Sequence, residues 1–418
     1  MTADTATGHA GVSVIRPRTP VAALDRADVR DDSVFEVVDV ARLVGMSAAF
    51  VRMVVGPVGA LSERDVLGLL DQDAFGETYV PRSRIIAHLR TLAGRVARPA
   101  GATVVMGGEW ELRCGHALDL LDGVANGSVN CVVTSTPYWG MRVYRDTHLV
   151  EWADGEACAY GHEQTPEGFA RHTVEVLAAL DRVLADGGSV WWNVMVTFNT
   201  RTQVRSSAVE TLRAMQGRDR RRWSEHASRR YSAGHSYIVD GEQCLIPHEI
   251  AKRASRIGLH VRSVITWAKP ACLREPHGSR VSRNVEYVLH LSKRRAPKFS
   301  RAAYNDTPAE WGGRTPREPQ ALCDVWSLSS SSGGGGHGAQ FPVALPGRCI
   351  ALSTTPGDVV LDPFVGSGTS GIAALYHRCR FVGLDTSPAY LAIAERRLRA
   401  TQTIAGRGDL DPQRPMSV

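Results

Sequence analysis

Three glycines and one aspartate near the C-terminus have the spacing of a nucleoside-binding turn. Gly366, Gly368 and Gly371 follow the short apolar segment VVLD, and Gly371 lies at the start of the helix-forming run SGIAAL. Glycine tolerates positive φ and lets a ligand approach the backbone, and the amides at a helix N-terminus attract polar or anionic groups. Asp385 ends the next apolar segment, FVGLD. It stands about 20 residues after Gly366, which is the spacing of an acid that binds ribose hydroxyls. The set predicts a nucleoside-type ligand.

A nicotinamide or flavin enzyme is the first class of protein to consider for such a turn. Only the segment from Thr386 to Val418 follows Asp385, which leaves room for one helix and a tail. A dinucleotide-binding fold needs several more strands after its acid. The remaining strands must therefore come from upstream, so this class fits poorly and the fold is predicted to be circularly permuted relative to that arrangement.

A second apolar segment, NCVVT, runs into a turn of polar and aromatic residues: Ser135, Thr136, Pro137, Tyr138 and Trp139. Alone, such a turn more often simply ends a strand. Together with DPF-x-GSGT, however, it resembles the amino DNA methyltransferases of the N4-cytosine and N6-adenine type. The order of the two turns resembles the group often called beta, and the resemblance covers roughly residues 105–400.

Further stretches are similar to the same family and occur in the expected order: GHALDLLDGVANGSVNCVVTS, LDRVLADGGSVWWNV, GEQCLIPHEIAKRASRIGLHVRSVITWAKP, RNVEYVLHLSK and HGAQFP. The resemblance implies S-adenosylmethionine as the methyl donor. It also implies cofactor contacts from Asp362, Phe364, Gly366, Ser367, Gly368, Thr369, Asp385, His116 and Phe341.

The resemblance also gives the turn at residue 135 a chemistry. An exocyclic amine is a poor nucleophile, since its lone pair is delocalised into the ring. By resemblance, Ser135 Oγ and the Thr136 carbonyl accept the amine hydrogens and aim the lone pair at the methyl group, and Pro137 fixes the turn. Tyr138 is expected to stack on a base extruded from the duplex.

Serine at position 135 favours cytosine N4 as the target, with adenine N6 as the alternative. A 5-methylcytosine enzyme needs a nucleophilic cysteine, which its family carries in a Pro-Cys pair, and this chain has no such pair. Two positions depart from the family pattern: Thr136 stands where proline is usual, and His116 where an acid is usual. A weakly active DNA-binding protein that keeps the fold is therefore a further alternative.

The order of the predicted elements indicates an α/β fold, a doubly wound, mostly parallel Rossmann-like methyltransferase sheet. Strands are predicted at 129–134, 189–194, 261–267, 285–291, 359–361 and 380–384, and helices at 169–184 and 390–398. The main domain spans 105–400, between a disordered N-terminus (1–34), a small helical domain (35–100) and a tail (401–418). In the helical domain, Ala41, Gly45, Ser47 and Val51 have helix-turn-helix spacing. DNA binding or plain helix packing would each explain it.

Arginines dominate an insertion at 197–232. Residues 197–230 hold nine arginines and three acids, a surplus equal to the net charge of +6 of the whole chain. A phosphate-binding segment would explain this charge, and so would a solvated insertion. The residues predicted to contact DNA are Arg218, Arg220, Arg221, Arg222, Arg229, Arg230 and Trp139. Residues 293–336 hold a candidate target-recognition segment and a flexible Ser/Gly linker.

The remaining features narrow the class of protein. The eight cysteines include no C-x-x-C pair and the histidines lack metal-ligand spacing, so we predict no metal site. We expect His172 and His290 to be core or surface residues, and Trp191 and Trp192 to be core residues rather than stacking groups. No apolar run is long enough for a membrane span and the N-terminus lacks a signal-peptide pattern, so a cytoplasmic location is expected. The expected partner is double-stranded DNA, with a cognate restriction endonuclease as a candidate. Oligomeric state stays open.

Overall fold

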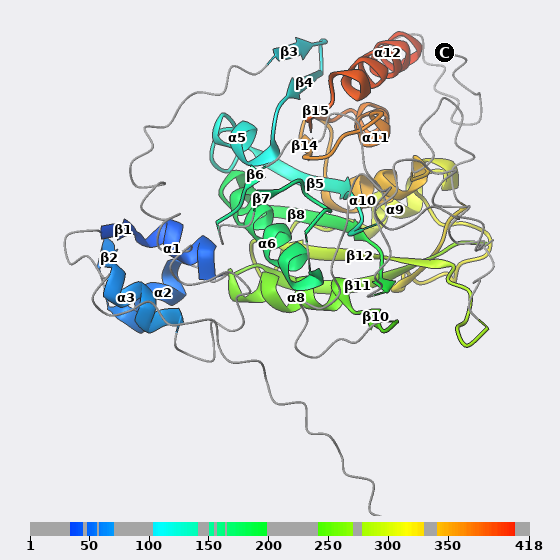
Figure 1. Cartoon of the computed structure of the whole chain (residues 1–418). Helices are drawn as coiled ribbons and strands as arrows, with labels where there is room; N and C mark the ends of the chain where they lie inside the picture. Colours follow the sequence, from blue (N-terminus) through cyan, green and yellow to red (C-terminus); the bar gives the residue numbers. More distant parts are fainter. Residues whose placement is uncertain are drawn as a thin grey trace, which may run out of the picture.

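A nine-stranded sheet forms the centre of the protein (Figure 1). The computed structural model describes residues 34–44, 48–56, 58–70, 103–140, 150–153, 157–163, 165–198, 241–270, 278–329 and 341–405. The strand order is β13-β11-β12-β8-β5-β14-β15-β4-β3. In chain order these strands are β3 (Thr103–Met106), β4 (Trp110–Cys114), β5 (Val129–Ser135), β8 (Leu184–Val194), β11 (His260–Ala268), β12 (Val285–Ser292), β13 (Val325–Ser327), β14 (Val359–Asp362) and β15 (Arg380–Asp385).

Five strands in the middle of the sheet run parallel to one another: β8, β5, β14, β15 and β4. Strand β12 runs antiparallel to β8, so its amino end lies where β8 ends. We call this edge the carboxyl rim. In open α/β sheets, ligands bind outside the carboxyl ends of the strands, so the carboxyl rim is where a site is expected.

The chain order of the strands is permuted, as predicted. Strands β14 and β15 come last in the chain but lie in the sheet between β5 and β4. All six predicted strands are present, and the largest difference in an end is at β8, which begins at Leu184 rather than at Ser189. The hairpin of β3 and β4 was not predicted, since its short strands carry the charged residues Glu111 and Arg113 among the apolar ones.

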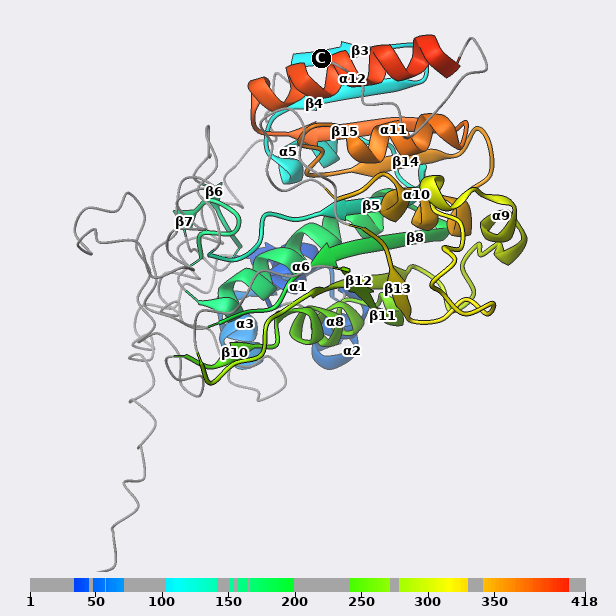
Figure 2. The same ribbon diagram turned by 90° about the vertical axis from the view of Figure 1, so that its right-hand side faces the viewer.

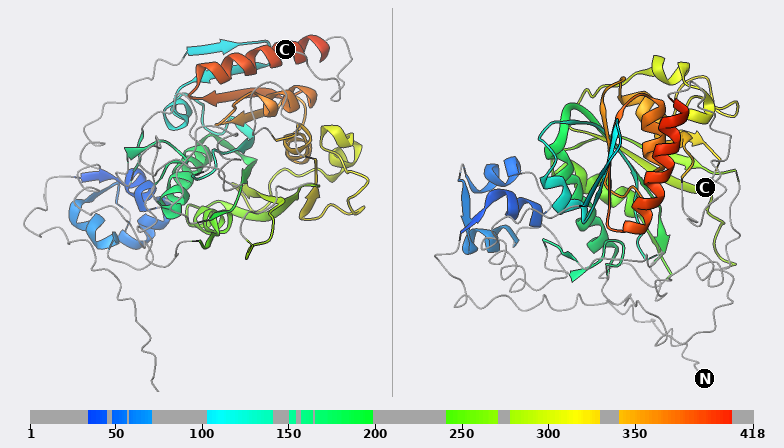
Figure 3. Two further views of the ribbon diagram at one scale, coloured as in Figure 1. Left: turned by 45° about the vertical axis from the view of Figure 1, so that its right-hand side comes forward. Right: turned by 90° about the horizontal axis from the view of Figure 1, so that it is seen from above.

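Helices cover both faces of the sheet, as the view from above in Figure 3 shows. The first face carries α5 (Ala117–Asp122), α6 (Pro166–Val183) and α8 (Ile246–Arg256), and the second carries α10 (Ala344–Ser353), α11 (Thr369–Tyr376) and α12 (Pro388–Ala405). Each face has its own apolar core. Neighbouring side chains on a strand point to opposite faces, so Trp192 is buried in the first core and Trp191 in the second. The doubly wound fold is thus confirmed.

A buried ion pair holds the segment after β12 against α10. The Arg348 guanidinium binds the Glu318 carboxylate through two contacts of 2.6 and 2.8 Å and donates to the carbonyls of Gly312 and Gly313. Burial alone would raise the pKa of Glu318, but the Arg348 hydrogen bonds and two backbone amides lower it overall. The segment also contains α9 (Arg301–Asp306) and the short helix η5 (Ala309–Trp311). Target recognition by this segment stays a prediction.

A small N-terminal unit lies beside α6 in Figures 1 and 2. It comprises α1 (Val37–Val44), α2 (Ala48–Val55), α3 (Glu63–Leu70) and the antiparallel pair of β1 (Val34–Glu36) and β2 (Ala60–Ser62). Ala41 and Val51 are buried in it. The turn at Gly45 and Ser47 lies outside the described residues, so the helix-turn-helix stays a prediction.

Four short strands complete the described elements: β6 (Val150–Glu151), β7 (Ala157–Cys158), β9 (Thr197–Phe198) and β10 (Gln243–Cys244). No helix in the described part of the chain is both long and apolar enough to span a bilayer.

Candidate active site

The two predicted turns meet at the carboxyl rim. Ser135 is the last residue of β5, and the adjacent strand β14 ends at Asp362. Asp385 ends β15, the next strand, and pairs with Cys114 at the end of β4. Segments that are distant in the chain therefore end side by side, because five parallel strands place their carboxyl ends on one edge.

The turn after β5 is part of a hydrogen-bonded side-chain cluster. Ser135 Oγ lies 3.3 Å from the Tyr138 hydroxyl. Asn193, which pairs with Ser135 across the strands, brings its Nδ2 to 3.2 Å from Ser135 Oγ and 2.9 Å from the Tyr138 hydroxyl. Pro137 is half-buried and Thr136 is buried, with the Thr136 amide donating to the Asn193 carbonyl at 3.3 Å.

Two charged residues complete this cluster from the neighbouring strands. Glu286, at the start of β12, accepts hydrogen bonds at Oε2 from the Tyr138 hydroxyl and, at 2.7 Å, from Asn193 Nδ2. Its other oxygen forms an ion pair with Lys269, which follows β11. Glu286 is 5 % exposed. Sequence reasoning missed Asn193, Lys269 and Glu286, although each is a polar residue close to a terminus of a strand: Asn193 near the end of β8, Lys269 directly after β11 and Glu286 at the start of β12.

Trp139, predicted to contact DNA, is buried in this structure, and its burial argues against that contact. The side chain is 2 % exposed and belongs to the first core. Its indole Nε1 donates to the Glu163 carbonyl at 2.9 Å. A buried indole with a satisfied N–H is a packing element. The predicted arginine contacts from Arg218 to Arg230 lie outside the described residues.

The glycine turn after β14 is held by Asp385. Its Oδ2 accepts the Gly366 amide and its Oδ1 accepts the Ser387 amide, each at 2.9 Å. Gly366 and Gly368 have φ of +51° and +83°, a region that glycine adopts without strain. Burial raises the pKa of Asp385, while hydrogen bonds from these amides oppose the change. A carboxylate offers about four acceptor sites, so Asp385 retains capacity for the hydroxyls of a nucleoside.

Other residues predicted to contact the cofactor also brace the turn through their side chains. Asp362 is 1 % exposed, and its two oxygens accept hydrogen bonds from the Phe364 amide and the Ser370 hydroxyl. Desolvation raises the pKa of Asp362 to about 6. Arg397 of α12, which sequence reasoning missed, donates to Ser367 and Thr369. These side chains are buried, so any ligand contact at Ser367 and Thr369 falls to their backbone.

Three further predicted cofactor residues surround the rim. Phe364 is half-buried and stacks on Tyr160 with ring centroids 5.0 Å apart. His116 is half-buried at the start of α5, directly after Gly115, whose amide donates to the Asp385 carbonyl at 3.0 Å. Phe341 precedes α10 and packs at the margin of the second core. The acid, the glycine turn and these partly exposed rings fit the parts of a nucleoside ligand.

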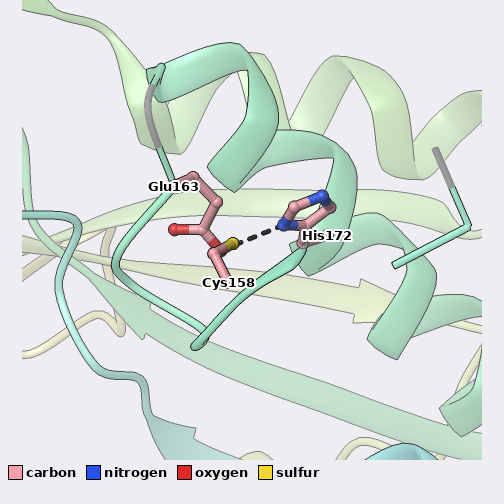
Figure 4. A group of neighbouring side chains, drawn as sticks. All are labelled: Cys158, Glu163 and His172. Carbon is pink, nitrogen blue, oxygen red and sulfur yellow. Dashed lines mark hydrogen bonds and ion pairs between the residues drawn. The ribbon is translucent and has the colours of Figure 1, made fainter. Parts of the chain in front are cut away.

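Cys158, Glu163 and His172 form a buried group of side chains at and before the start of α6 (Figure 4). Their donor atoms all lie within 4.8 Å of one another, and His172 Nδ1 is 3.1 Å from a Glu163 oxygen. A structural zinc site in proteins has four ligands, whereas this group offers three. His172 also stacks on Trp152 with centroids 4.3 Å apart. The group therefore ties the start of α6 to the segment before it.

His290 and Trp191 are buried core residues, one of the two roles that the sequence indicated for the histidine and the one indicated for the tryptophan. His290 is buried, stacks on Trp191 at 3.8 Å and lies 3.0 Å from Ser189 Oγ. Desolvation and the nearby Arg262 lower the pKa of His290 to about 3, so it is a neutral core residue. Trp326, at the second core, donates to the Cys323 carbonyl and packs beside Arg348.

This strand order, with both turns on the carboxyl rim, defines an α/β methyltransferase fold. The family model described as DNA methylase, for the N6 and N4 enzymes, matches residues 129–396. The chain therefore belongs to the N6/N4 amino DNA methyltransferase family, whose enzymes use S-adenosylmethionine as methyl donor.

Several named proteins are similar to this chain. The Type II methyltransferase M.XycI of Xanthomonas campestris pv. cyanopsidis is 31% identical over 68% of this chain and 86% of its own length. M.Cfr9I of Citrobacter freundii is 29% identical over 69% of this chain and 87% of its own length. Among solved structures, the PvuII cytosine-N4-specific DNA methyltransferase aligns with 72% of this chain and 93% of its own, at 17% identity and a TM-score of 0.49.

Proposed function

We propose that this protein transfers a methyl group from S-adenosylmethionine to the N4 amine of a cytosine extruded from double-stranded DNA. The observation that carries the proposal is the position of Ser135 and Tyr138 on the same rim as the glycine turn and Asp385. Nucleophile and methyl donor must meet in line, and one rim with a turn for each supports that requirement. Adenine N6 is the alternative target.

On the cofactor side, the backbone at Gly366 and Gly368, the Asp385 carboxylate and the rings of Phe364, His116 and Phe341 would hold S-adenosylmethionine. The cofactor supplies an electrophilic methyl group. The Asp385 carboxylate already accepts two amide hydrogen bonds from the turn, and it would bind the ribose hydroxyls of S-adenosylmethionine through its remaining acceptor sites. His116 stands where the family usually has an acid. With a neutral imidazole, it would accept a hydrogen bond from the amine of the cofactor's adenine.

On the base side, Ser135 Oγ and the Thr136 carbonyl would accept the two amine hydrogens. Accepting both hydrogens localises the nitrogen lone pair, which then attacks the methyl carbon while the carbon–sulfur bond breaks. S-adenosylhomocysteine would be the leaving group, and the methylated nitrogen would release its surplus proton to water. Tyr138 would stack on the extruded base, with its hydroxyl anchored to Glu286.

Chromatography and mass spectrometry of digested DNA test this function. The purified protein is incubated with methyl-labelled S-adenosylmethionine and DNA of mixed sequence, and the nucleosides are separated. We expect label in N4-methyldeoxycytidine. Label in N6-methyldeoxyadenosine would move the target to adenine, and no label in either nucleoside would favour a DNA-binding protein that has lost catalysis, for which His116 and Thr136 are the candidate causes.

The cellular role we propose is modification within a restriction–modification pair, in the cytoplasm. The relatives M.Cfr9I and M.XycI are both named as Type II methyltransferases. The pairing predicts that a cognate endonuclease fails to cleave DNA methylated by this protein. Digestion of that DNA by endonucleases of known site would reveal the protected sequence.

A further inference from the structure

Glu286 is a carboxylate at the carboxyl rim whose role above is limited to anchoring the Tyr138 hydroxyl. It is 5 % exposed and receives hydrogen bonds from the Tyr138 hydroxyl and Asn193 Nδ2, while Lys269 pairs with its second oxygen. Lys269 also lies 4.7 Å from the centre of the Trp267 ring, which limits its freedom. Such a set of contacts holds the carboxylate in one place.

An ionised carboxylate accepts hydrogen bonds and cannot donate them. The hydroxyl hydrogen of Tyr138 therefore points toward Glu286, and its oxygen is left to accept hydrogen bonds. Its two other polar neighbours are Asn193 Nδ2 at 2.9 Å and Ser135 Oγ at 3.3 Å, so the hydrogen of Ser135 can point toward Tyr138. The hydrogen bonds then run in one direction, from Ser135 through Tyr138 to Glu286.

The same argument fixes the side-chain amide of Asn193. Only its Nδ2 can face Glu286 Oε2, since an amide oxygen there would face a negative charge at 2.7 Å. Nδ2 also approaches Ser135 Oγ and the Tyr138 hydroxyl. Every group next to Ser135 in this cluster thus depends on the charge at position 286.

We infer that Glu286 is a positioning residue that makes Ser135 Oγ a hydrogen-bond acceptor toward the target amine. The inference rests on the proposed function. A serine hydroxyl can donate or accept, and only acceptance helps to localise the amine lone pair. With its hydrogen committed to Tyr138, Ser135 Oγ presents a lone pair to the base. Glu286 sets this order through Tyr138 and Asn193, without touching the base itself.

The test is the single-turnover rate of methyl transfer at saturating S-adenosylmethionine and DNA. Glu286→Gln is isosteric but brings an amide that can donate, so the order of the chain is no longer fixed. We expect a fall of about 10- to 100-fold, the range of one lost hydrogen bond to a charged group, with unchanged affinity for S-adenosylmethionine. A rate within about twofold of wild type would overturn the inference.

A double-mutant cycle tests whether Glu286 acts through the serine. In a Ser135→Ala background, Glu286→Gln should have almost no further effect, because the acceptor it orders is gone. Additive losses would contradict the inference. If the rate of Ser135→Ala is too slow to measure, Tyr138→Phe serves as the background and the same non-additivity is expected.

Two more variants distinguish a positioning role of Glu286 from a general effect of substitution on folding. Lys269→Met removes the cation that fixes Glu286 and should lower the rate in the wild-type background but not beside Ser135→Ala. Asp186→Asn is the matched control, since it removes a carboxylate paired with Arg294 at the amino end of β8, on the edge opposite the rim. It should leave the rate unchanged. A wild-type protein without methyl transfer to any base refutes the proposed function, whereas an active protein with a fully active Glu286→Gln refutes only this inference.

Discussion

The two halves of the carboxyl rim are built in different ways. In the base-side half, the side chains of Ser135, Tyr138, Asn193, Lys269 and Glu286 bond to one another. In the cofactor-side half, the carboxylates of Asp362 and Asp385 bond to the backbone of the turn. The base-side half is a network of side chains, whereas the cofactor-side half is a loop held by carboxylates. A substitution in the base-side half should therefore change the rate of methyl transfer. A substitution in the cofactor-side half should change the turn geometry or the affinity for S-adenosylmethionine.

Ser135→Ala should give the largest effect in the base-side half. It removes the proposed acceptor for an amine hydrogen, and loss of one aligned group of this kind costs about 10²- to 10³-fold in rate. S-adenosylmethionine affinity, measured by calorimetry, should stay within about twofold. Ser128→Ala, an exposed serine bonded to the Ala125 carbonyl, is the control. Equal rates for the two variants would remove Ser135 from the mechanism.

Asp362 should make folding stability depend on pH. Its pKa is raised from 3.8 to about 6 in the folded state, so the folded protein binds this proton more tightly than the unfolded chain. Stability from this group is therefore full below about pH 4 and is lost as the pH rises through about 6, by about 3 kcal/mol in total.

Asp362→Asn removes this dependence and tests it. In urea unfolding, the variant should gain about 2 kcal/mol relative to wild type between about pH 4 and about pH 7. Asp186→Asn is the control. Asp186 lies in the first part of β8 and forms an exposed ion pair with Arg294, so its substitution should leave the dependence of stability on pH unchanged. Parallel stability curves for wild type and Asp362→Asn would show that the aspartate titrates normally.

Asp385→Asn should weaken cofactor binding more than chemistry. The amide loses charge and acceptor capacity toward ribose hydroxyls while it must still serve the amides of Gly366 and Ser387. The dissociation constant of S-adenosylmethionine should rise about 10- to 100-fold. Unchanged affinity in calorimetry would exclude the proposed ribose contact, and Asp186→Asn again provides the matched comparison.

Trp139→Phe tests whether Trp139 belongs to the packed core or to the DNA-contacting surface of the base-side half. Trp139 is buried and bonded to the Glu163 carbonyl, so its loss should lower the free energy of unfolding by about 1–3 kcal/mol. DNA affinity, measured by fluorescence anisotropy below the melting temperature, should not change. Weaker DNA binding with unchanged stability would restore the residue to the DNA interface.

The sequence was most informative where one segment contains its own signal. The strand, the positive-φ glycines and the acid of the cofactor-side half all lie in the single short segment from Val359 to Asp385, and the structure places the glycine turn and the acid on one rim. The order of strands and helices likewise predicted the permuted, doubly wound sheet. These features depend on local periodicity and turn chemistry, which a single sequence displays.

The parts that escaped prediction depend on strand pairing. Asn193, Lys269 and Glu286 meet Ser135 only because β8, β11 and β12 pair in a particular register. Trp139 looked like an exposed aromatic of the turn, but its burial follows from packing against the segment around Glu163. Arg397 reaches the glycine turn from α12, a helix that begins only after the next strand has ended.

The most direct test of the division of the rim compares two variants in one experiment. Single-turnover methyl transfer is measured for Ser135→Ala and Asp385→Asn at S-adenosylmethionine concentrations far above either dissociation constant. The account predicts that Asp385→Asn approaches the wild-type rate at saturation, while Ser135→Ala stays about 10²-fold or more below it. Saturating rates that fall equally in both variants, or a Ser135→Ala variant that recovers full rate, would contradict it.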